Sequence, residues 1–259
     1  MSIKVAVTGA RGRVGTMIVE EILRSDDLEL VAGFDLVGAG EPLGRGVGLS
    51  GASHLTEVLQ KTEPDVLIDF TVAKAAVENV SVASSLGIDL VVGTTGFTED
   101  HWKEMRSAID GNVSAVITPN FSIGVNTFWR LIEVAARAFQ GYDVEVIEAH
   151  HRLKKDSPSG TAVAAVNILK GATGIDEVVY GRKGISERGS EIGVHAVRAG
   201  DIVGDHTVLF AGPGERLEIK HQAHSRQAFV TGAIMAARWV VGAPPGIYSM
   251  KDVLNKAAT

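Results

Sequence analysis

The sequence predicts an α/β protein built from two different sheet-containing domains, and two observations lead to this prediction. Within residues 3–117, short apolar runs alternate with segments whose apolar residues recur at helical spacing. From residue 191 onward, strand-like runs follow one another and are joined by short, glycine-containing turns. We therefore expect a Rossmann-type parallel sheet, wound right-handedly, and a second α+β domain with a mixed or antiparallel sheet.

The alternating region has recognisable elements in order. Strands are predicted at residues 3–8, 28–34, 66–70, 90–92 and 113–117, and helices at 14–23, 55–61, 73–86 and 99–109. Thr98 is expected to cap the last of these helices, since Glu99 and Asp100 in its first turn complement the helix dipole. The intervening residues 38–51 are rich in glycine and are expected to form a surface loop.

The remaining elements are less regular. A helix is predicted at 123–139, a strand at 143–149 and a helix from Thr161 to about 171, and 182–190 is polar and expected to be mobile. Further strands are predicted at 192–199, 206–211 and 217–223, followed by helices at 228–241 and 250–256.

Composition limits the classes of function. The chain has 259 residues, 45% of them hydrophobic, which suffices for a large core in one or two domains. A formal charge of −6 argues against general nucleic-acid binding. The absence of cysteine excludes disulfides, a thiolate nucleophile and cysteine metal ligands. An apolar strand within three residues of the N-terminus leaves no room for a signal peptide, and no apolar run approaches a membrane span, so we expect a cytoplasmic protein.

A glycine-rich loop follows the first predicted strand and opens the first predicted helix. Its residues are Gly9, Ala10, Arg11, Gly12, Arg13, Val14 and Gly15. Strand, glycine loop and helix is the order that a dinucleotide site requires, although G-x-x-G-x-x-G alone is equally consistent with a tight turn. Asp35 ends the second strand 20 residues after Gly15, where a carboxylate can accept hydrogen bonds from ribose hydroxyls. The combination favours a bound dinucleotide.

Two more loops follow strands of the same sheet. They are Gly93-Thr94-Thr95 and Thr118-Pro119-Asn120-Phe121. Ligands of parallel sheets bind at the carboxyl ends of strands, although each loop could equally be an ordinary turn.

The stretch from Glu148 to Ala162 is the richest in candidate catalytic and anion-binding residues. It holds His150 and His151, a cluster of cations including Lys154, and a Pro-Ser-Gly-Thr sequence before an apolar helix. A helix start offers unpaired amides to an anion, and histidine titrates nearest to neutral pH. A solvated basic loop before a capped helix is the alternative, but the whole constellation favours an anion-binding acid/base site.

This stretch, Glu-Ala-His-His-x-x-Lys-x-Asp-x-Pro-Ser-Gly-Thr-Ala, resembles the signature of the dihydrodipicolinate (4-hydroxy-tetrahydrodipicolinate) reductase family. The likeness covers nearly the whole chain and is close again in 197–221. It implies NAD(P)H-dependent reduction of 4-hydroxy-tetrahydrodipicolinate, a cyclic dicarboxylate, to tetrahydrodipicolinate with loss of water, in lysine and diaminopimelate biosynthesis. By resemblance His150 transfers a proton, Lys154 is a second donor, and His151, Gly160 and Thr161 contact substrate.

The resemblance also implies an organisation. The cofactor domain would comprise 1–122 and 231–259, and 123–230 would form the substrate and oligomerisation domain of a homotetramer. The loops 93–95 and 118–121 would contact the nicotinamide half of the cofactor. Some members carry an arginine after the acidic ribose-binding residue, where this chain has Leu36. We therefore expect both NADH and NADPH to be used, with NADH equal or better, and with Arg11 or Arg13 partly offsetting the charge of Asp35.

Three alternatives compete with this interpretation. Another amino-acid-pathway dehydrogenase, such as an aspartate or homoserine dehydrogenase, lacks the His-His-x-x-Lys and Pro-Ser-Gly-Thr arrangement. A non-catalytic nicotinamide sensor would need no acid/base pair and would usually carry a DNA-binding or partner module. A metal enzyme is disfavoured because the histidines lack the i, i+4 spacing of zinc-binding helices, so no metal is expected.

Overall fold

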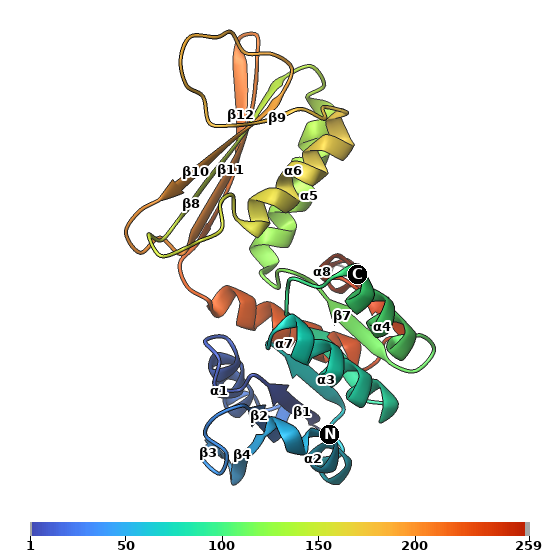
Figure 1. Cartoon of the computed structure of the whole chain (residues 1–259). Coiled ribbons are helices and arrows are strands. Elements are labelled where there is room, and N and C mark those ends of the chain that lie inside the picture. The colour runs from blue at the N-terminus through green and yellow to red at the C-terminus, as the bar shows by residue number, and fades with distance from the viewer. Residues whose placement is uncertain (1, 257–259) are drawn as a thin grey trace. The chain divides into compact units, whose positions relative to one another are not determined.

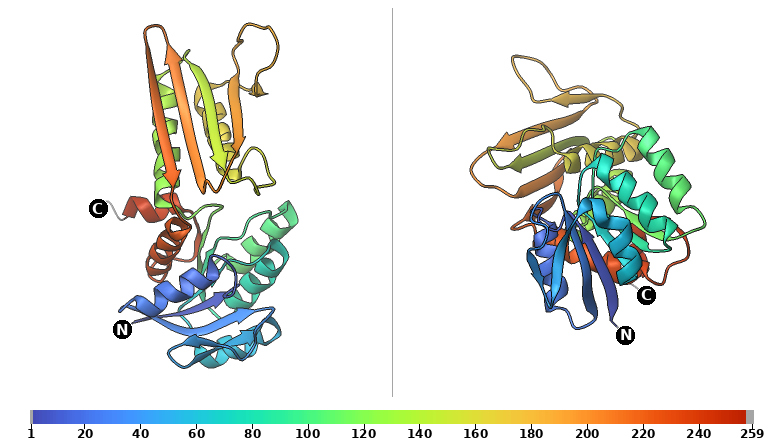
Figure 2. Two further views of the ribbon diagram at one scale, coloured as in Figure 1. Left: turned by 90° about the vertical axis from the view of Figure 1, so that its left-hand side faces the viewer. Right: turned by 60° about the horizontal axis from the view of Figure 1, so that its bottom comes forward.

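The computed structural model describes residues 2–256 and divides the chain into two compact units. Unit 1 is formed within residues 1–123 and 227–259, and unit 2 comprises Gly124–Arg226. Figure 1 labels the elements of each unit, and Figure 2 shows the same ribbon from two further directions.

Unit 1 is organised around one largely parallel sheet. Its strands are β1 (Ile3–Thr8), β2 (Leu28–Asp35), β3 (Pro42–Gly44), β4 (Val47–Gly51), β5 (Val66–Asp69), β6 (Asp89–Val92), β7 (Ser114–Ile117) and β13 (Gly246–Tyr248). Their spatial order is β13-β7-β6-β5-β1-β2-β4-β3, and only the β3–β4 pair is antiparallel. The order reverses between β1 and β5, which is the place where doubly wound sheets bind ligands.

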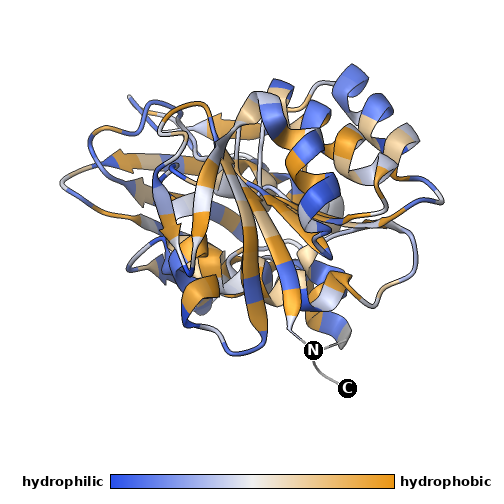
Figure 3. Cartoon of the chain, turned by 90° about the horizontal axis from the view of Figure 1, so that it is seen from below, coloured by the Kyte–Doolittle hydropathy of each residue, from blue (hydrophilic) through white to orange (hydrophobic). Residues whose placement is uncertain are grey.

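Helices cover both faces of this sheet. They are α1 (Gly15–Arg24), α7 (Gln227–Val240) and α8 (Met250–Lys256) on one side, and η1 (Ala52–His54), α2 (Leu55–Thr62), α3 (Ala73–Ser85) and α4 (Glu99–Ile109) on the other. Alternate residues of a strand face opposite sides, so Val5 and Val7 pack under the first group while Ala6 packs under the second. Figure 3 shows strands that are mostly apolar and helices that alternate between apolar and polar residues.

Unit 2 contains a second, mixed sheet. Its strands are β8 (Asp143–His150), β9 (Val178–Tyr180), β10 (Ile192–Arg198), β11 (Gly204–Gly212) and β12 (Glu215–Ala223), in the order β12-β11-β8-β10-β9. The β8–β10 and β10–β9 pairs are parallel, and the β8–β11 and β11–β12 pairs are antiparallel. Helices α5 (Ile123–Ala138) and α6 (Gly160–Thr173) pack on one face, as Figure 2 shows. The predicted fold class, a parallel-sheet domain plus a mixed-sheet domain, is confirmed.

The prediction of a simple surface loop at residues 38–51 is wrong. This segment contains the hairpin β3–β4, and β4 extends the main sheet by pairing in parallel with β2 through Gly33, Phe34 and Asp35. Frequent glycines lower the intrinsic strand propensity, but Leu49 is buried against the core and stabilises the pairing. The hairpin therefore flanks the end of β2, next to Asp35.

The start of α6 also differs from the prediction. The helix begins at Gly160, and its N-cap is Ser159, whose hydroxyl accepts a hydrogen bond from the amide of Ala162 at 3.2 Å. Thr161 is thus the second helical residue. By contrast, the predicted cap of α4 is confirmed, because the Thr98 hydroxyl accepts from the amide of His101 at 3.2 Å.

Within residues 2–256, no helix is long and apolar enough to cross a membrane.

Candidate active site

The glycine loop after β1 is packed so tightly that side chains are excluded at two positions. Gly9 has φ +73°, and a Cβ there would lie 2.8 Å from the carbonyl oxygen of Phe70. A Cβ on Gly15 would lie 1.9 Å from the carbonyl oxygen of Gly9. Only glycine fits both positions, so the loop turns closely over the start of α1 as a phosphate-binding loop does.

Asp35 lies beside this loop at the end of β2. One carboxylate oxygen accepts the amide of Arg11 at 2.9 Å, and the other accepts the amide of Leu36 at 2.7 Å. The side chain of Arg11 forms an ion pair with Glu41, next to the β3–β4 hairpin. Asp35 is therefore oriented by two backbone amides, and the charge of Arg11 is already paired with another carboxylate.

A cavity of about 360 Å³ opens at the carboxyl ends of the strands in unit 1. It is lined by Arg13, Val14, Phe70, Thr71, Val72, Ala73, Gly93, Thr94 and Thr95. Two loops predicted to bind a cofactor, those after β1 and β6, thus meet at one cavity together with the loop after β5. The cavity lies where the order of the strands reverses, which suits a dinucleotide.

A buried carboxylate holds these loops together. Asp69, with 0% exposure, ends β5 and accepts hydrogen bonds from the hydroxyls of Thr8, Thr71 and Thr94 at 2.7, 2.8 and 2.9 Å. The amide group of Asn79 on α3 adds a contact at 2.6 Å. Because these threonines end or follow β1, β5 and β6, Asp69 fixes the rim of the cavity.

The predicted loop 118–121 has a different environment. Thr118 and Phe121 are buried, and the Phe121 ring packs on Phe70 with centroids 5.6 Å apart. Neither residue lines the cavity, and Pro119 and Asn120 also lie outside its lining. Phe121 shapes the cavity indirectly, through the position of Phe70.

In unit 2, His150 is the last residue of β8 and only 8% exposed. Its Nδ1 lies 2.6 Å from Oε2 of Glu148. An ionised carboxylate only accepts hydrogen bonds, so Nδ1 donates and the neutral ring keeps Nε2 as its acceptor. Gly204 has no side chain, and a Cβ at that position would lie only 3.0 Å from Nε2 of His150. Glycine at position 204 therefore leaves space beside this nitrogen.

Glu148 is fully buried, and its carboxylate is surrounded by donors. Arg198 contacts both carboxylate oxygens at 2.8 Å, and the amide of Ser159 donates at 3.0 Å. Burial raises the pKa of Glu148, but the hydrogen bonds from Arg198, His150 and Ser159 outweigh burial and hold this pKa below its ordinary value. Glu148 therefore stays ionised and fixes the orientation of the His150 ring.

The pKa of His150 lies below its ordinary value. Burial lowers it most, the hydrogen bond and charge of Glu148 raise it, and the positive charges of Lys154 and Arg198 lower it. The free site therefore contains a largely neutral imidazole at neutral pH. An anionic ligand placed beside this ring would favour its protonated form and make it a proton donor.

His206 of β11 supports the same site from the neighbouring strand. Its ring lies 5.1 Å from that of His150, and its Nε2 lies 2.9 Å from the hydroxyl of Ser159. Burial lowers the pKa of His206 from 6.5 to about 4, with the charge of His150 adding to the effect. A neutral His206 thus holds the cap of α6 next to the Glu148–His150 pair.

The other predicted residues lie on the loop between β8 and α6 and at the start of α6. The Nζ of Lys154 lies 2.9 Å from the carboxylate of Asp156, and this hydrogen bond lowers the pKa of Asp156. His151 and Lys154 are partly exposed. Gly160 is exposed, and a Cβ added to it would meet no neighbouring atom within 4 Å. The start of α6 is therefore open to a ligand, and the charge of Lys154 reaches His150.

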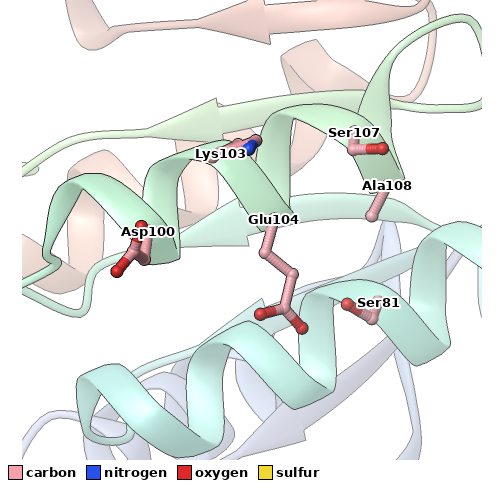
Figure 4. A pocket seen from close by; sticks show the side chains of 6 residues that line it. All are labelled: Ser81, Asp100, Lys103, Glu104, Ser107 and Ala108. Carbon is pink, nitrogen blue, oxygen red and sulfur yellow. The ribbon is translucent and has the colours of Figure 1, made fainter.

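A larger cavity, of about 510 Å³, lies elsewhere in unit 1, between α3 and α4. Figure 4 shows Glu104 of α4 and Ser81 of α3 directed into the space between these helices. The other lining residues are Asp100, Lys103, Ser107 and Ala108. Its charged side chains are exposed, so we interpret this cavity as a surface groove between helices.

Among the described residues, no group of three or more histidine, aspartate or glutamate side chains is arranged to hold a metal ion.

Several residues that shape the site were not singled out by the sequence analysis. Glu148 could have been found from the sequence, since it stands two residues before His150 on a predicted strand and its side chain must lie on the same face. Arg198 and Ser159 are brought to Glu148 by strand pairing and by the helix cap. No neighbouring residue in the sequence points to Asp69, because its hydrogen-bond partners come from the ends of separate strands.

We expect substitution of Gly160 by valine to weaken substrate binding selectively. The start of α6 is open, and a branched side chain would fill the space in front of its first turn. The Michaelis constant for the substrate should rise while cofactor affinity stays unchanged. Gly171→Val, on the same helix and equally free of close neighbours, is the matched control. Loss of cofactor affinity with unchanged substrate affinity would contradict this placement.

Comparisons with known proteins agree on one family. The model described as "Dihydrodipicolinate reductase, N-terminus" matches residues 3–121, and "Dihydrodipicolinate reductase, C-terminus" matches residues 124–254. The 4-hydroxy-tetrahydrodipicolinate reductase of Methanosarcina barkeri is 53% identical over 98% of this chain and 99% of its own length. That of Methanocaldococcus jannaschii is 51% identical over 98% of this chain and 97% of its own length.

A solved structure extends the similarity to three dimensions. Dihydrodipicolinate reductase from Paenisporosarcina sp. TG-14, with dipicolinate bound, superposes with a TM-score of 0.83 at 26% identity. The match covers 97% of this chain and 99% of that one. An amine dehydrogenase from Mycobacterium smegmatis shares the fold at 16% identity, with a TM-score of 0.63 over 96% of this chain and 95% of that one.

Proposed function

The chain belongs to the dihydrodipicolinate reductase family, and from this premise we propose how its two units divide the reaction. The protein is an oxidoreductase of lysine biosynthesis that reduces 4-hydroxy-tetrahydrodipicolinate to tetrahydrodipicolinate with loss of water. Unit 1 binds NADH or NADPH, and unit 2 binds the substrate and carries the residues that donate protons to it. For the two functional domains we propose the bounds 1–122 with 231–259 for the cofactor and 123–230 for the substrate, which differ by up to four residues from the bounds of the two units.

The cofactor assignment rests on unit 1. We assign to the dinucleotide the glycine loop 9–15, Asp35, the loop 93–95 and, although it does not line the cavity, the loop 118–121. The close packing of Gly9 and Gly15 and the cavity at the carboxyl ends of β1, β5 and β6 support the assignment. The bound cofactor supplies the hydride, and the protein supplies position.

The substrate assignment rests on unit 2. A dicarboxylate needs two cationic or amide-rich sites, and the open start of α6 and the side chain of Lys154 offer them. We assign Gly160, Thr161 and His151 to substrate contacts. Elimination of the hydroxyl group and a proton from the neighbouring carbon as water turns the substrate into a conjugated cyclic imine. Hydride addition to that imine leaves an enamine that must gain a proton. His150 and Lys154 are assigned to that transfer as proton donors.

The buried Glu148–His150 contact is the observation that carries this proposal. An ordinary solvated basic loop would not need a fully buried carboxylate that is held by Arg198 and a helix cap and directed at one histidine. The direct test is consumption of reduced cofactor on adding the freshly prepared condensation product of pyruvate and aspartate semialdehyde. Pyruvate alone and aspartate semialdehyde alone are the controls. Consumption with aspartate semialdehyde alone would indicate a different dehydrogenase.

We expect NADH to be used as well as or better than NADPH. Asp35 repels a 2′-phosphate, and Leu36 cannot pair with one, while Arg11 offers only an exposed contact. Exposed ion contacts weaken as salt rises, so the catalytic efficiency with NADPH should fall faster with ionic strength than that with NADH. Arg11→Ala should widen the gap in favour of NADH, and Arg24→Ala should not. A strong preference for NADPH that is insensitive to salt would contradict this assignment.

We propose in addition that the chain assembles as a homotetramer through the sheet of unit 2. The face of this sheet opposite α5 and α6 carries Ile147 and Val197, which are 39% and 44% exposed. Burial of such apolar side chains favours association. The molar mass in solution tests this proposal, and a monomer at working concentrations would contradict it.

A further inference from the structure

The Arg11–Glu41 ion pair lies where the cofactor's adenosine ribose is expected. Glu41 is not among the residues assigned to cofactor or substrate binding. Glu41 immediately precedes the β3–β4 hairpin, labelled in Figure 1. Its amide donates to the carbonyl oxygen of Gly38 at 3.0 Å, and its carbonyl oxygen accepts the amide of Leu49 at 2.8 Å. The backbone of Glu41 is therefore held by the hairpin, close to the end of β2.

The carboxylate of Glu41 is also placed firmly. A Cβ on Gly38 would lie 3.1 Å from it, so the carboxylate rests against the chain that follows Asp35 and Leu36. Gly38 has φ +81°, a conformation that favours glycine, and its missing side chain leaves this space to Glu41. Glu41 and Asp35 thus both hold Arg11, one bonded to its guanidinium and the other to its amide.

This arrangement has a consequence for a cofactor that carries a 2′-phosphate. Glu41 contacts the guanidinium of Arg11, and Asp35 accepts a hydrogen bond from its backbone amide. A phosphate must therefore overcome the negative charge of Asp35 and also displace Glu41 from the guanidinium. A cofactor with a free ribose diol meets neither obstacle, because its hydroxyls can donate to Asp35. The exposed fractions of the Arg11 and Glu41 side chains, 35% and 56%, leave both within reach of a ligand.

We propose that Glu41 is a specificity-determining residue that competes with a 2′-phosphate for Arg11, weakens that contact and so biases the site toward NADH. The proposal rests on the cofactor site proposed for unit 1. It differs from the roles of Asp35 and Leu36, because it places the discrimination in a hairpin outside the glycine loop and the end of β2. Removing the charge of Glu41 should free Arg11 to pair with the phosphate.

The test compares two nucleotides that differ only in the 2′-phosphate, AMP and adenosine 2′,5′-bisphosphate, titrated calorimetrically into the full chain. Glu41→Gln should strengthen binding of the bisphosphate relative to AMP by roughly five- to tenfold, as expected for one released surface ion pair and one removed repulsion. Glu20→Gln, which removes another exposed carboxylate that contacts an arginine, should leave the ratio unchanged.

A second variant separates this mechanism from a general charge effect. In the double variant Arg11→Ala/Glu41→Gln the gain should disappear, because the released partner is then absent. An unchanged ratio in Glu41→Gln, or a gain that persists without Arg11, would overturn the role of Glu41. Failure of both nucleotides to bind the parent chain would instead overturn the cofactor site of unit 1, and this inference with it.

Discussion

Replacing His150 or Lys154 by alanine is expected to lower kcat by about 10²–10⁴, the usual contribution of a positioned acid or base. Cofactor binding should persist in both variants, since both residues belong to unit 2 and the dinucleotide is assigned to unit 1. The ring of His150 is held by Glu148, and Lys154 adds a positive charge close to it. Turnover rates and the dissociation constant of the cofactor, measured for each variant, check this expectation.

The neighbouring Lys155 provides the matched control. It is exposed on the same loop, and Lys155→Ala removes one positive charge without touching the groups assigned to proton transfer. It should retain near-normal turnover. If His150→Ala and Lys154→Ala also turned over near-normally, this site would have no part in the reaction.

Glu148→Gln is expected to have an effect of similar size, although Glu148 is a positioning residue that acts through His150. An amide cannot accept from His150, Arg198 and Ser159 at once, so the ring of His150 loses its fixed orientation and tautomer. A loss in kcat of about 10²–10⁴ is expected, as for other groups on which general acid–base catalysis depends. The Michaelis constant for the cofactor should change little.

The pH profile distinguishes this role from simple loss of structure. The hydrogen bond and charge of Glu148 raise the pKa of His150 against the effect of burial. Without the carboxylate this pKa falls further, so the limb of the rate profile that reports His150 should move to lower pH. This limb moves to lower pH whether catalysis requires the protonated or the neutral ring of His150. A reduced rate with an unmoved limb would show that Glu148 acts only on stability.

Glu145→Gln is the control for Glu148→Gln. Glu145 lies on the same strand and also contacts a histidine and two arginines, namely His195, Arg182 and Arg188. It points to the opposite face of the sheet, because it is an odd number of residues from Glu148. Its loss should leave the rate profile unmoved, which separates the position of Glu148 from the general effect of removing a carboxylate.

Much of the fold was predictable because its periodic elements are strongly patterned. The strand Ile3–Thr8 and the last helix, from Met250, have the predicted bounds, and other long elements begin or end within a few residues. The unpredicted strands β3, β4, β9 and β13 are short and contain glycine or lie at sheet edges. Their pairing depends on neighbouring strands, so no local pattern reveals it.

The candidate site was predictable only where its residues are close in sequence. His150, Lys154 and the start of α6 lie on one loop and its flanking elements, and the sequence motif placed them together. Arg198 lies 50 residues from Glu148, and His206 lies 47 residues from Ser159. These contacts depend on the register between β8, β10 and β11, which a single sequence does not reveal.

Hydride transfer from the nicotinamide cofactor to a cyclic dicarboxylate imine is the central claim, and isotope transfer tests it most directly. The enzyme would be supplied with NADH carrying deuterium at the transferred position and with the fresh condensation product of pyruvate and aspartate semialdehyde. We predict that the tetrahydrodipicolinate formed contains one deuterium on a ring carbon, in amounts equal to the NADH consumed. Oxidation of the cofactor without deuterium in this product would contradict the claim.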